Sequence, residues 1–549
     1  MAKHQTHLTT ARLRLEREWH IWNLTHQIKA NARLKTDSHP VVMFDASTRL
    51  SGFSQNAAFA LLTTWSLQLA GVPVIHFACR AGMSRCVLGT DPDHPWKAPP
   101  CEACTTQAKK LYASAETQWF EYQPNPELAS ALKGLSFDEL SKFEFPFGDR
   151  GQSSTVCGQS SIPLGVLALP SLRWALRRHH LSNDKATRFL LREYIQSAYQ
   201  VVVDFAALLT EVDPRAVVLF NGLQFPEAAA RWVARQFGVP AITHEVGFQS
   251  FSVFFTHGEA TAYPIEIPEE FELSPGQFGR VEAQYQRRLQ GDFTMAGITF
   301  WPQMNELDED FLQFSGRFQQ IVPVFTNVIF DTSQVHANTI FPQMFAWLDL
   351  VLEIMRAHPE TLFVIRAHPD EMRAGKQSRE SVRQWVADNG VEQLPNVKFV
   401  PSDAPLSSYE LIRRSKFVMV YNSSIGLEAT LLGAPVLCGG KARYTRYPTV
   451  FLPSNSEDYR SMAEQFLAAE NIEIPAKFTR NAWRFMYYQF YRAALPLDRY
   501  LEAHPTPGYV QLKRFGWRDL LPENSPTLNV IVEGILNGEQ FLMPEESGK

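Results

Sequence analysis

The sequence predicts an α/β protein of two domains, each a parallel β-sheet covered by helices. At 549 residues the chain is too long for one hydrophobic core, so two large domains are expected. In both halves, short apolar runs alternate with longer stretches of helical periodicity, which is the pattern of repeated βαβ units. Hydrophobic residues make up 45% of the chain and charged residues 20%, the composition of an ordinary globular protein.

Charge and hydropathy argue against several classes of function. The net charge of −5 provides no basic surplus to neutralise nucleic-acid phosphates. No stretch is apolar over the length needed to cross a bilayer, and residues 1–7 form no apolar signal region. We therefore expect a cytoplasmic protein and leave open a peripheral contact at the inner membrane face. The chain lacks a Gly-x-x-x-x-Gly-Lys-Ser/Thr loop and a Gly-x-Gly-x-x-Gly fingerprint after its first strand, which argues against ATPases and dehydrogenases.

The first half opens with an amphipathic helix at about residues 9–33 and continues as two βαβ units. Apolar runs predict the strands, and glycines predict the ends of the helices. The predicted elements are strand 41–45, helix 57–70 and strand 73–78, then strand 216–220, helix 226–237 and strand 238–245.

A loop after the second strand holds four of the six cysteines: Cys79, Cys86, Cys101 and Cys104. This loop has little to bury, and four thiolates on one Zn²⁺ would hold it in place. The spacing is not that of a standard zinc finger. An iron–sulfur cluster, reduced cysteines and two disulfides are the alternatives, of which disulfides are disfavoured in a cytoplasmic protein.

The second half begins with the apolar run 321–331 and repeats the alternation. The predicted elements are helix 344–357, strands 361–365, 397–400 and 417–420, helix 427–432 and strand 434–437. Polar side chains follow these strands at the edge where open parallel sheets bind ligands. Asn327 follows the first strand, and Arg366 and His368 follow the second. The last two suit a diphosphate, which they would bind or stabilise as it leaves, although capping and salt bridging would also explain them.

The stretch 421–438 has the form of a strand end, a polar turn and a helix start. Asn422, Ser423 and Ser424 are residues that cap helices, and Gly426 would let a ligand approach the backbone. Free N–H groups at a helix start favour an anion such as a diphosphate. Glu428 would repel phosphate, so we assign it to sugar or ribose hydroxyls. An ordinary capped helix with an acidic first turn would show the same pattern.

The residues Ser-Ser-Ile-Gly-Leu-Glu-Ala, followed by Leu-Gly-Ala-Pro-Val, resemble the donor-side signature of GT-B type glycosyltransferases. The chain is most similar to the capsule polysaccharide biosynthesis group, which includes bacterial Kdo transferases. The likeness covers roughly 321–444 and is weaker over 217–247. It implies two Rossmann-like domains facing a central cleft, here with extra helices and a Cys-rich loop in the first domain.

The resemblance also implies roles for individual residues. The first domain would face the acceptor, and His244 or Glu245 would activate the acceptor hydroxyl. A buried strand histidine and a capping or paired glutamate are the alternatives. Ser402 becomes a candidate contact to the nucleotide base, and Lys441 a candidate contact to donor phosphates or to a sugar carboxylate. With Arg366 and His368 supplying charge, no catalytic metal is required.

The predicted function is transfer of a sugar from a nucleotide-sugar donor to a glycan or lipid-linked acceptor in bacterial surface polysaccharide biosynthesis. A nucleotide-sugar 2-epimerase is the first alternative. A non-catalytic subunit that binds sugar nucleotides or glycans is the alternative of another class. The expected division is an acceptor-side domain at 1–265 with its Cys-rich loop at 76–105, a connection at 266–318, a donor domain at 319–460, and helices at 461–549 that return to the first domain.

Overall fold

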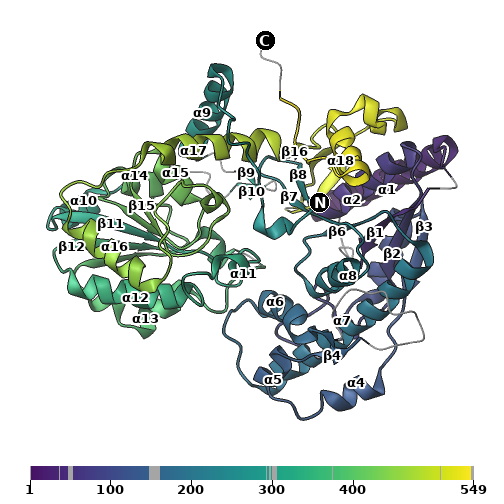
Figure 1. Cartoon of the computed structure of the whole chain (residues 1–549), viewed down its shortest axis with the longest axis horizontal. Coiled ribbons are helices and arrows are strands. Elements are labelled where there is room, and N and C mark those ends of the chain that lie inside the picture. Colours follow the sequence, from purple (N-terminus) through teal and green to yellow (C-terminus); the bar gives the residue numbers. More distant parts are fainter. Residues whose placement is uncertain are drawn as a thin grey trace.

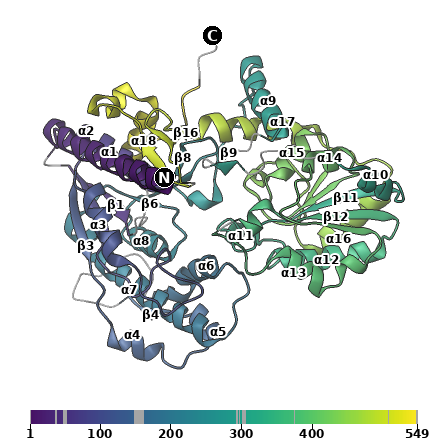
Figure 2. The ribbon, with the colours of Figure 1, turned by 180° about the vertical axis from the view of Figure 1, so that it is seen from behind.

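The computed structural model describes residues 2–35, 38–46, 53–147, 161–291, 294–295, 298–299, 306–373, 375–506 and 508–545. The chain forms two α/β domains that lie side by side and are linked along one edge (Figure 1, and from behind in Figure 2). Each has a central sheet with helices on both faces, as the alternation of apolar runs predicted.

The first domain is built on a seven-stranded sheet with the order β16-β8-β7-β6-β1-β2-β3. Strands β7, β6, β1, β2 and β3 are parallel, and β8 and β16 add an antiparallel edge. The bounds are β1 (Val41–Asp45), β2 (Val74–Cys79), β3 (Glu116–Phe120), β6 (Ala216–Phe220), β7 (Ala241–Val246), β8 (Ser252–Thr256) and β16 (Leu495–Pro496). The central strands are buried along nearly their whole length because helices cover both faces.

Two apolar clusters cover the two faces of this sheet. Ser54 caps one covering helix through a hydrogen bond from the Ala57 N–H, and Asp184 caps another through the Thr187 N–H. The helices are α1 (Ala2–Asn31), α2 (Gln55–Leu69), α3 (Cys101–Leu111), α4 (Pro126–Ala131), α5 (Phe137–Ser141), α6 (Leu164–Leu176), α7 (Lys185–Val212) and α8 (Phe225–Gln236). The short strands β4 (Phe145–Pro146) and β5 (Ser161–Ile162) pair antiparallel in a separate sheet.

The second domain has a five-stranded parallel sheet with the order β13-β12-β11-β14-β15. Its strands are β11 (Gln320–Phe325), β12 (Thr361–Arg366), β13 (Val397–Val400), β14 (Val418–Val420) and β15 (Val436–Cys438). Its helices are α10 (Glu309–Ser315), α11 (Gln334–Ala337), α12 (Met344–Ala357), α13 (Val382–Asp388), α14 (Ser408–Arg413), α15 (Ile425–Leu431) and α16 (Ser456–Ala468). This is the doubly wound arrangement predicted from the sequence.

Two segments connect the domains at their shared edge. On the way out, the chain passes through α9 (Pro275–Leu289) and the short strands β9 (Thr294–Met295) and β10 (Ile298–Thr299). On the way back, α17 (Ala476–Tyr487) packs on the second domain with α15 and α9. The return to the first domain therefore begins after α17, where β16 joins the first sheet. The last elements, β17 (Leu501–Ala503), β18 (Val510–Leu512) and α18 (Pro526–Asn537), pack on α2 and its neighbours.

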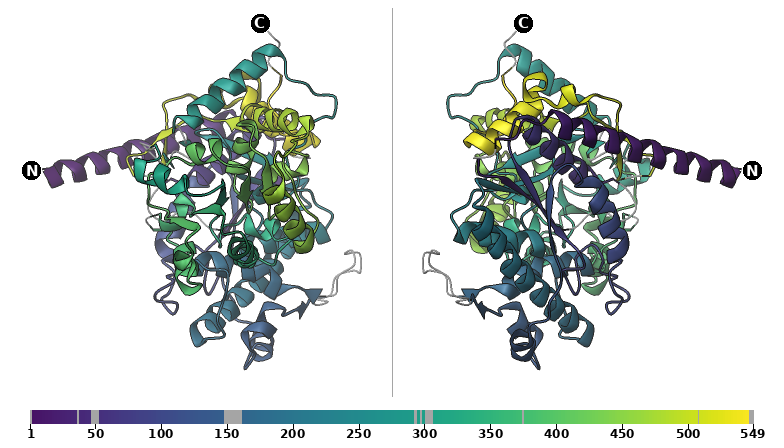
Figure 3. Two further views of the ribbon diagram at one scale, coloured as in Figure 1. Left: turned by 90° about the vertical axis from the view of Figure 1, so that its left-hand side faces the viewer. Right: turned by 90° about the vertical axis from the view of Figure 1, so that its right-hand side faces the viewer.

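The parallel strands of both sheets end toward the space between the domains, so the loops that carry the predicted polar residues face each other. The predicted GT-B-like architecture is thereby confirmed. Helix α1 runs along the first domain and extends past its edge (Figure 3). In the part of the chain that the structure describes, no helix combines the length and the apolar character needed to cross a membrane.

Candidate functional site

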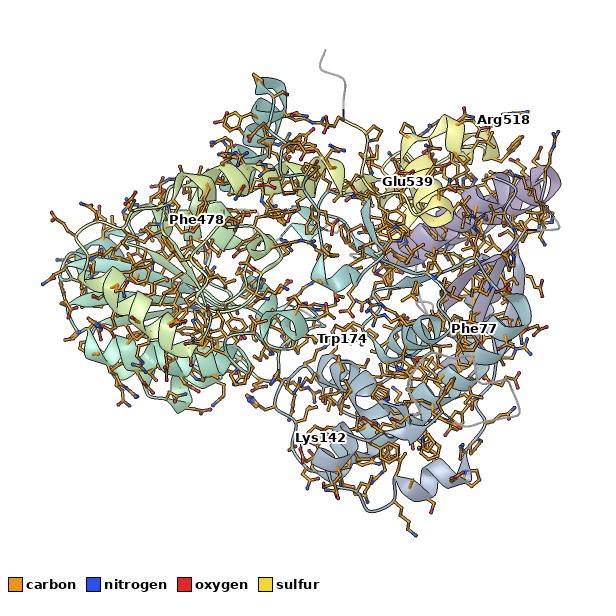
Figure 4. The ribbon with its side chains drawn as sticks, in the orientation of Figure 1. Phe77, Lys142, Trp174, Phe478, Arg518 and Glu539 are labelled. Carbon is orange, nitrogen blue, oxygen red and sulfur yellow. The ribbon has the colours of Figure 1, made fainter. Side chains whose placement is uncertain are left out.

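A large cavity of about 1100 Å³ lies between the two domains. Trp174, at the end of α6, lies between the domains and lines this cavity (Figure 4). The cavity gathers ten of the predicted catalytic and donor-binding residues from both halves of the chain: His244, Glu245, Asn327, Arg366, His368, Asn422, Ser423, Ser424, Glu428 and Lys441. Two other predicted residues, Ser402 and Gly426, are not among the described residues that line the cavity. Ser402 is buried away from it.

The cavity lies over the switch points of the two sheets, where neighbouring strands carry their connections in opposite directions. In the second domain, Asn327 after β11 donates from its Nδ2 to Asn422 Oδ1 after β14, at 2.7 Å. In the first domain, Asp45 ends β1 and Asn221 follows β6. The carboxyl ends of parallel strands therefore supply polar groups on both sides of one cavity.

His368 is placed in the cavity in a defined protonation state. Its Nδ1 accepts the Asp370 N–H at 3.1 Å, which leaves Nε2 to carry the ring proton. Burial lowers the pKa of this imidazole, so the neutral ring persists at neutral pH. His368 can therefore offer one N–H to a ligand but does not bring a fixed positive charge.

Arg366 has a structural task that the sequence did not reveal. Its Nη2 donates to the Ala404 carbonyl at 2.8 Å, and its Nη1 donates to the Pro401 carbonyl. Burial lowers the pKa of its guanidinium to about 10. The side chain thus holds the loop after β13, and a direct diphosphate contact is not the role that this geometry favours.

The turn before α15 differs from the predicted anion site. The helix is only seven residues long, and within the described structure the hydroxyl of its N-cap residue, Ser424, accepts no hydrogen bond from the helix. The N–H groups of Gly426 and Leu427 already donate to the carbonyls of Ser423 and Ser424. Few free donors remain for an anion.

Packing within the second domain explains why residue 426 is a glycine, and the close approach of a ligand that we expected is not needed to explain it. A Cβ at this position would lie 2.3 Å from the Tyr444 hydroxyl oxygen and 3.1 Å from Val420 Cγ2. Tyr444 is itself held by a hydrogen bond to the Ser423 carbonyl at 2.8 Å. The glycine lets α15 pack against this tyrosine.

Glu428 is buried and engaged by protein side chains, so its assignment to sugar hydroxyls is not supported. Its Oε1 accepts two hydrogen bonds from Arg288 of α9, at 3.0 and 2.7 Å. Its Oε2 accepts the Tyr409 hydroxyl at 2.7 Å. The carboxylate joins α9, α14 and α15 and fixes Arg288 beside the cavity.

Two further cations of the second domain reach the cavity. Lys441 is exposed there, and its own backbone N–H is fixed by the Ala337 carbonyl at 2.9 Å. The guanidinium of Arg443 lies 4.6 Å from the centre of the Phe248 ring and 5.8 Å from that of Tyr263, both residues of the first domain. Arg443 therefore contacts both domains and lines the cavity between them.

His244 has the surroundings of a core residue. Phe59, Phe220 and Phe255 surround its ring, with centroids 5.3 to 6.4 Å away. Burial lowers its pKa to about 3, and its Nδ1 has no hydrogen-bond partner among the described residues. With so low a pKa and only 2% of its surface exposed, His244 is a poor proton acceptor at neutral pH, so its predicted role as base is not supported.

Glu245 faces the cavity with its carboxylate oriented by neighbours. Its Oε2 accepts from Asn221 Nδ2 at 3.0 Å, and its Oε1 accepts the Val246 N–H at 2.9 Å. Burial raises the pKa of this carboxyl. Both features suit a group that holds an acceptor hydroxyl or receives its proton.

Glu227 is a cavity residue that the sequence analysis missed. It lies in the first turn of α8, is 5% exposed, and lines the cavity beside the end of β1. Burial raises the pKa of its carboxyl to about 8, and the nearby Asp45 adds to the shift. The sequence did contain a signal: Glu227 directly follows Pro226 in the first turn of the helix that comes after the strand end at Asn221-Gly222. Asp45 was missed although it ends a predicted strand, and Arg288 was missed because nothing in its local pattern indicated a site.

The four loop cysteines surround a second, small cavity of about 30 Å³. The Gly82 N–H donates to Cys79 Sγ at 3.1 Å, and the Gly89 N–H donates to Cys86 Sγ at 3.2 Å. Burial raises the pKa of both thiols to about 12, and the neighbouring cysteines add to the shift. Within the described ranges no group of three or more His, Cys, Asp or Glu side chains is placed to hold a metal, so the predicted zinc site is not found.

Comparison with known proteins adds two sequence similarities. Residues 298–447 match the model of the family described as capsule polysaccharide biosynthesis protein. This segment spans β11 to β15 and includes the second-domain wall of the cavity. Protein FixF of Sinorhizobium fredii (strain NBRC 101917 / NGR234) is 32% identical over 101 residues, which are 18% of this chain. The chain matches about a fifth of that relative's length, 21%.

Three solved structures are also similar. The KpsC beta Kdo 2,4 transferase of Thermosulfurimonas dismutans is 13% identical over 55% of this chain and 84% of its own, with a TM-score of 0.33. The beta Kdo 2,7 transferase of the same KpsC is 13% identical over 61% and 90%, with a TM-score of 0.33. The UDP-GlcNAc 2-epimerase of Neisseria meningitidis, bound to UDP-GlcNAc, is 12% identical over 81% and 97%, with a TM-score of 0.24. The family that the motif at 423–436 resembled is thus matched by residues 298–447 of the chain.

Proposed function

We propose that the protein is a glycosyltransferase that moves a sugar from a nucleotide-sugar donor to a hydroxyl of a glycan or lipid-linked acceptor in surface polysaccharide biosynthesis. One observation supports this most. Two carboxyls of raised pKa, Glu227 and Glu245, line the same cavity as cations of the second domain, Lys441 and Arg443. The family match over the second-domain wall agrees with this proposal.

In this proposal the second domain holds the donor by its phosphate end. Lys441 and Arg443 offset the charge that develops on the departing phosphate, and the Nε2–H of His368 donates one directed hydrogen bond. Arg288 stays beside them, oriented by Glu428. These side chains take the electrostatic role that a metal has in other transferases.

The first domain would place the acceptor hydroxyl against the carboxyls. Glu227 is proposed as the base, because a pKa of about 8 is close to the working pH and matches proton uptake from a hydroxyl. Glu245 would position the same hydroxyl, since Asn221 and Val246 hold its carboxylate in a fixed direction. Closing the cavity around both substrates brings the two reactants together.

The test is a transfer assay with a panel of nucleotide sugars and glycan acceptors. Glu227→Gln should lower kcat by about 10²- to 10⁴-fold while leaving KM for the donor near its original value. Because the base must be deprotonated, wild-type kcat/KM should rise with pH and level off above about 8, and the variant should lose that rise. Glu211→Gln, on the exposed end of α7, is the matched control and should behave as wild type.

Two other results would point to the alternatives. Conversion of the donor to its 2-epimer without acceptor would indicate an epimerase. A donor that raises the melting temperature but is never turned over would indicate a binding subunit. The thermal-shift screen also identifies the donor class, since a ligand at about a hundred times its Kd adds about 2.7 kcal/mol to the free energy of unfolding.

A further inference from the structure

Helix α1 carries an exposed apolar stripe on the face that points away from the first domain. Leu15, Trp19 and Trp22 are 67%, 63% and 57% exposed. Their spacing, i, i+4 and i+7, places them in one row along the helix. His26 continues the row, with its ring 4.1 Å from that of Trp22 and its Nδ1 bonded to the Trp22 carbonyl. Two exposed tryptophans in one row are unusual for a face that meets only water.

The other face of α1 fixes the helix to the domain, so the stripe is not a misplaced part of the core. Ile21, Leu24 and Ile28 are buried in the apolar cluster that also holds residues of α2 and α18. The ring of His20 packs edge-on against Phe515 at 5.4 Å. With one apolar face inside the fold and another outside it, α1 has a surface to offer to a partner. Figure 3 shows the helix on the outside of the first domain.

Charge distinguishes the possible partners. The first 35 residues carry two acidic side chains, Glu16 and Glu18, in a chain whose net charge is −5. Glu18 is paired with Lys110 at 2.9 Å. The basic side chains of the same segment are Lys3, Arg12, Arg14, Arg17, Lys29, Arg33 and Lys35. Among these, Lys29, Arg33 and Lys35 are exposed where α1 ends.

We propose that α1 binds the surface of an anionic membrane, with Leu15, Trp19 and Trp22 in the headgroup region and the exposed basic side chains at the end of the helix against lipid phosphates. Tryptophan is enriched at membrane–water interfaces because its ring is apolar and its N–H remains hydrated. A helix that lies in the interface needs such an apolar row beside basic residues. A second copy of α1 is the less suitable partner, because two helices with the same basic excess repel each other. This inference does not depend on the proposed transferase activity.

Sedimentation of the full chain with lipid vesicles tests the proposal. With vesicles of phosphatidylcholine and phosphatidylglycerol, the bound fraction should exceed that with phosphatidylcholine alone by about tenfold and should fall at high salt. The double substitution Trp19→Ala and Trp22→Ala should weaken binding by tenfold or more. Lys29→Glu with Arg33→Glu should remove the preference for the anionic lipid.

The controls separate membrane binding from misfolding and from self-association. Trp96→Ala removes another exposed tryptophan, one in the cysteine loop, and should leave vesicle binding unchanged. Each variant should keep the wild-type melting temperature, because the substituted side chains lie outside the core. Equal binding by wild type and the double tryptophan variant would overturn the proposal. The proposal would also be overturned if wild type did not bind the vesicles and instead formed a dimer, seen by light scattering, that dissociates when the tryptophans are substituted.

Discussion

Two histidines, His244 and His368, show how burial decides what a side chain can do at this site. His244 lies within β7, two residues before its end, His368 lies two residues after the end of β12, and both line the same cavity. His244 is enclosed by three phenylalanine rings, whereas the Nδ1 of His368 is satisfied by a backbone N–H and its Nε2 can reach a ligand. Their sequence contexts are alike, and their packing differs.

Glu227 should make stability depend on pH. Its folded pKa of about 8 is above the ordinary glutamate value of 4.5, so the folded state retains a proton that the unfolded chain releases. The stabilisation is complete below the unfolded pKa and is lost as pH rises toward 8. As pH rises from 5 to 9, we expect the free energy of unfolding of Glu227→Gln to increase relative to that of wild type by up to about 4 kcal/mol. Melting temperatures measured across this range check it, and parallel curves for the two proteins would contradict it.

Gly426→Ala should destabilise the second domain. The new Cβ would collide with the Tyr444 hydroxyl, which is held by the Ser423 carbonyl and cannot move freely. We expect a loss of about 1–3 kcal/mol, measured by denaturant unfolding. Gly279→Ala is the control: it lies in α9 with no atom within 4 Å of the added carbon, and should be neutral or slightly stabilising.

Helices α9, α14 and α15 are joined by one buried ion pair. Arg288 and Glu428 are 15% and 4% exposed, and Tyr409 completes the contact. An ion pair of this kind is costly to break from one side, because the remaining charge stays buried. It fixes α9, in the connection between the domains, to the start of α15.

A double-mutant cycle measures this junction. Arg288→Met and Glu428→Gln alone should each cost about 3–5 kcal/mol, and the double variant should cost clearly less than their sum. Thermal unfolding provides the comparison. If Glu428→Gln instead leaves stability unchanged and raises only the donor KM, the carboxylate binds sugar hydroxyls after all and our structural assignment is wrong.

The two domains also touch at the far side of the cavity, in a contact that we call the clasp. Glu380 of the second domain accepts the N–H groups of His179 and His180 at 2.8 and 3.0 Å and pairs with the His180 ring. Arg379 pairs with Asp93, and its N–H donates to the Arg177 carbonyl at 2.9 Å. Together with the edge that carries α9 and α17, the clasp encloses the cavity.

Glu380→Ala should loosen the clasp. The substitution removes a charged acceptor of backbone N–H groups, worth about 1–3 kcal/mol of domain closure. Small-angle X-ray scattering should record a larger radius of gyration, while the melting temperature of each domain stays near wild type. Glu353→Ala, which removes a surface ion pair with Arg460 inside the second domain, should leave the radius unchanged. An unchanged radius in both variants would show that the clasp does not restrain the domains.

Local pattern was sufficient for the architecture. Strands such as β6 and β13 coincide with their predicted ranges, because continuous apolar runs are buried on both sides of a parallel sheet. The meeting of the two strand-end edges also followed, since parallel strands carry their carboxyl ends to one edge. Most predicted polar residues therefore reached the cavity.

Side-chain roles were decided by contacts between residues far apart in the chain. Glu428 lies 140 residues from Arg288, its partner, and Arg366 donates to carbonyls more than thirty residues away. Local periodicity does not predict such partners, because these residues come into contact only when the helices and sheets pack together. For this protein, hydrophobic pattern alone specified the parallel strands β1, β2, β6, β7 and β11 to β15, but it did not predict β3, β8 and β16 of the first sheet. Packing assigned each charge either to the cavity or to another side chain.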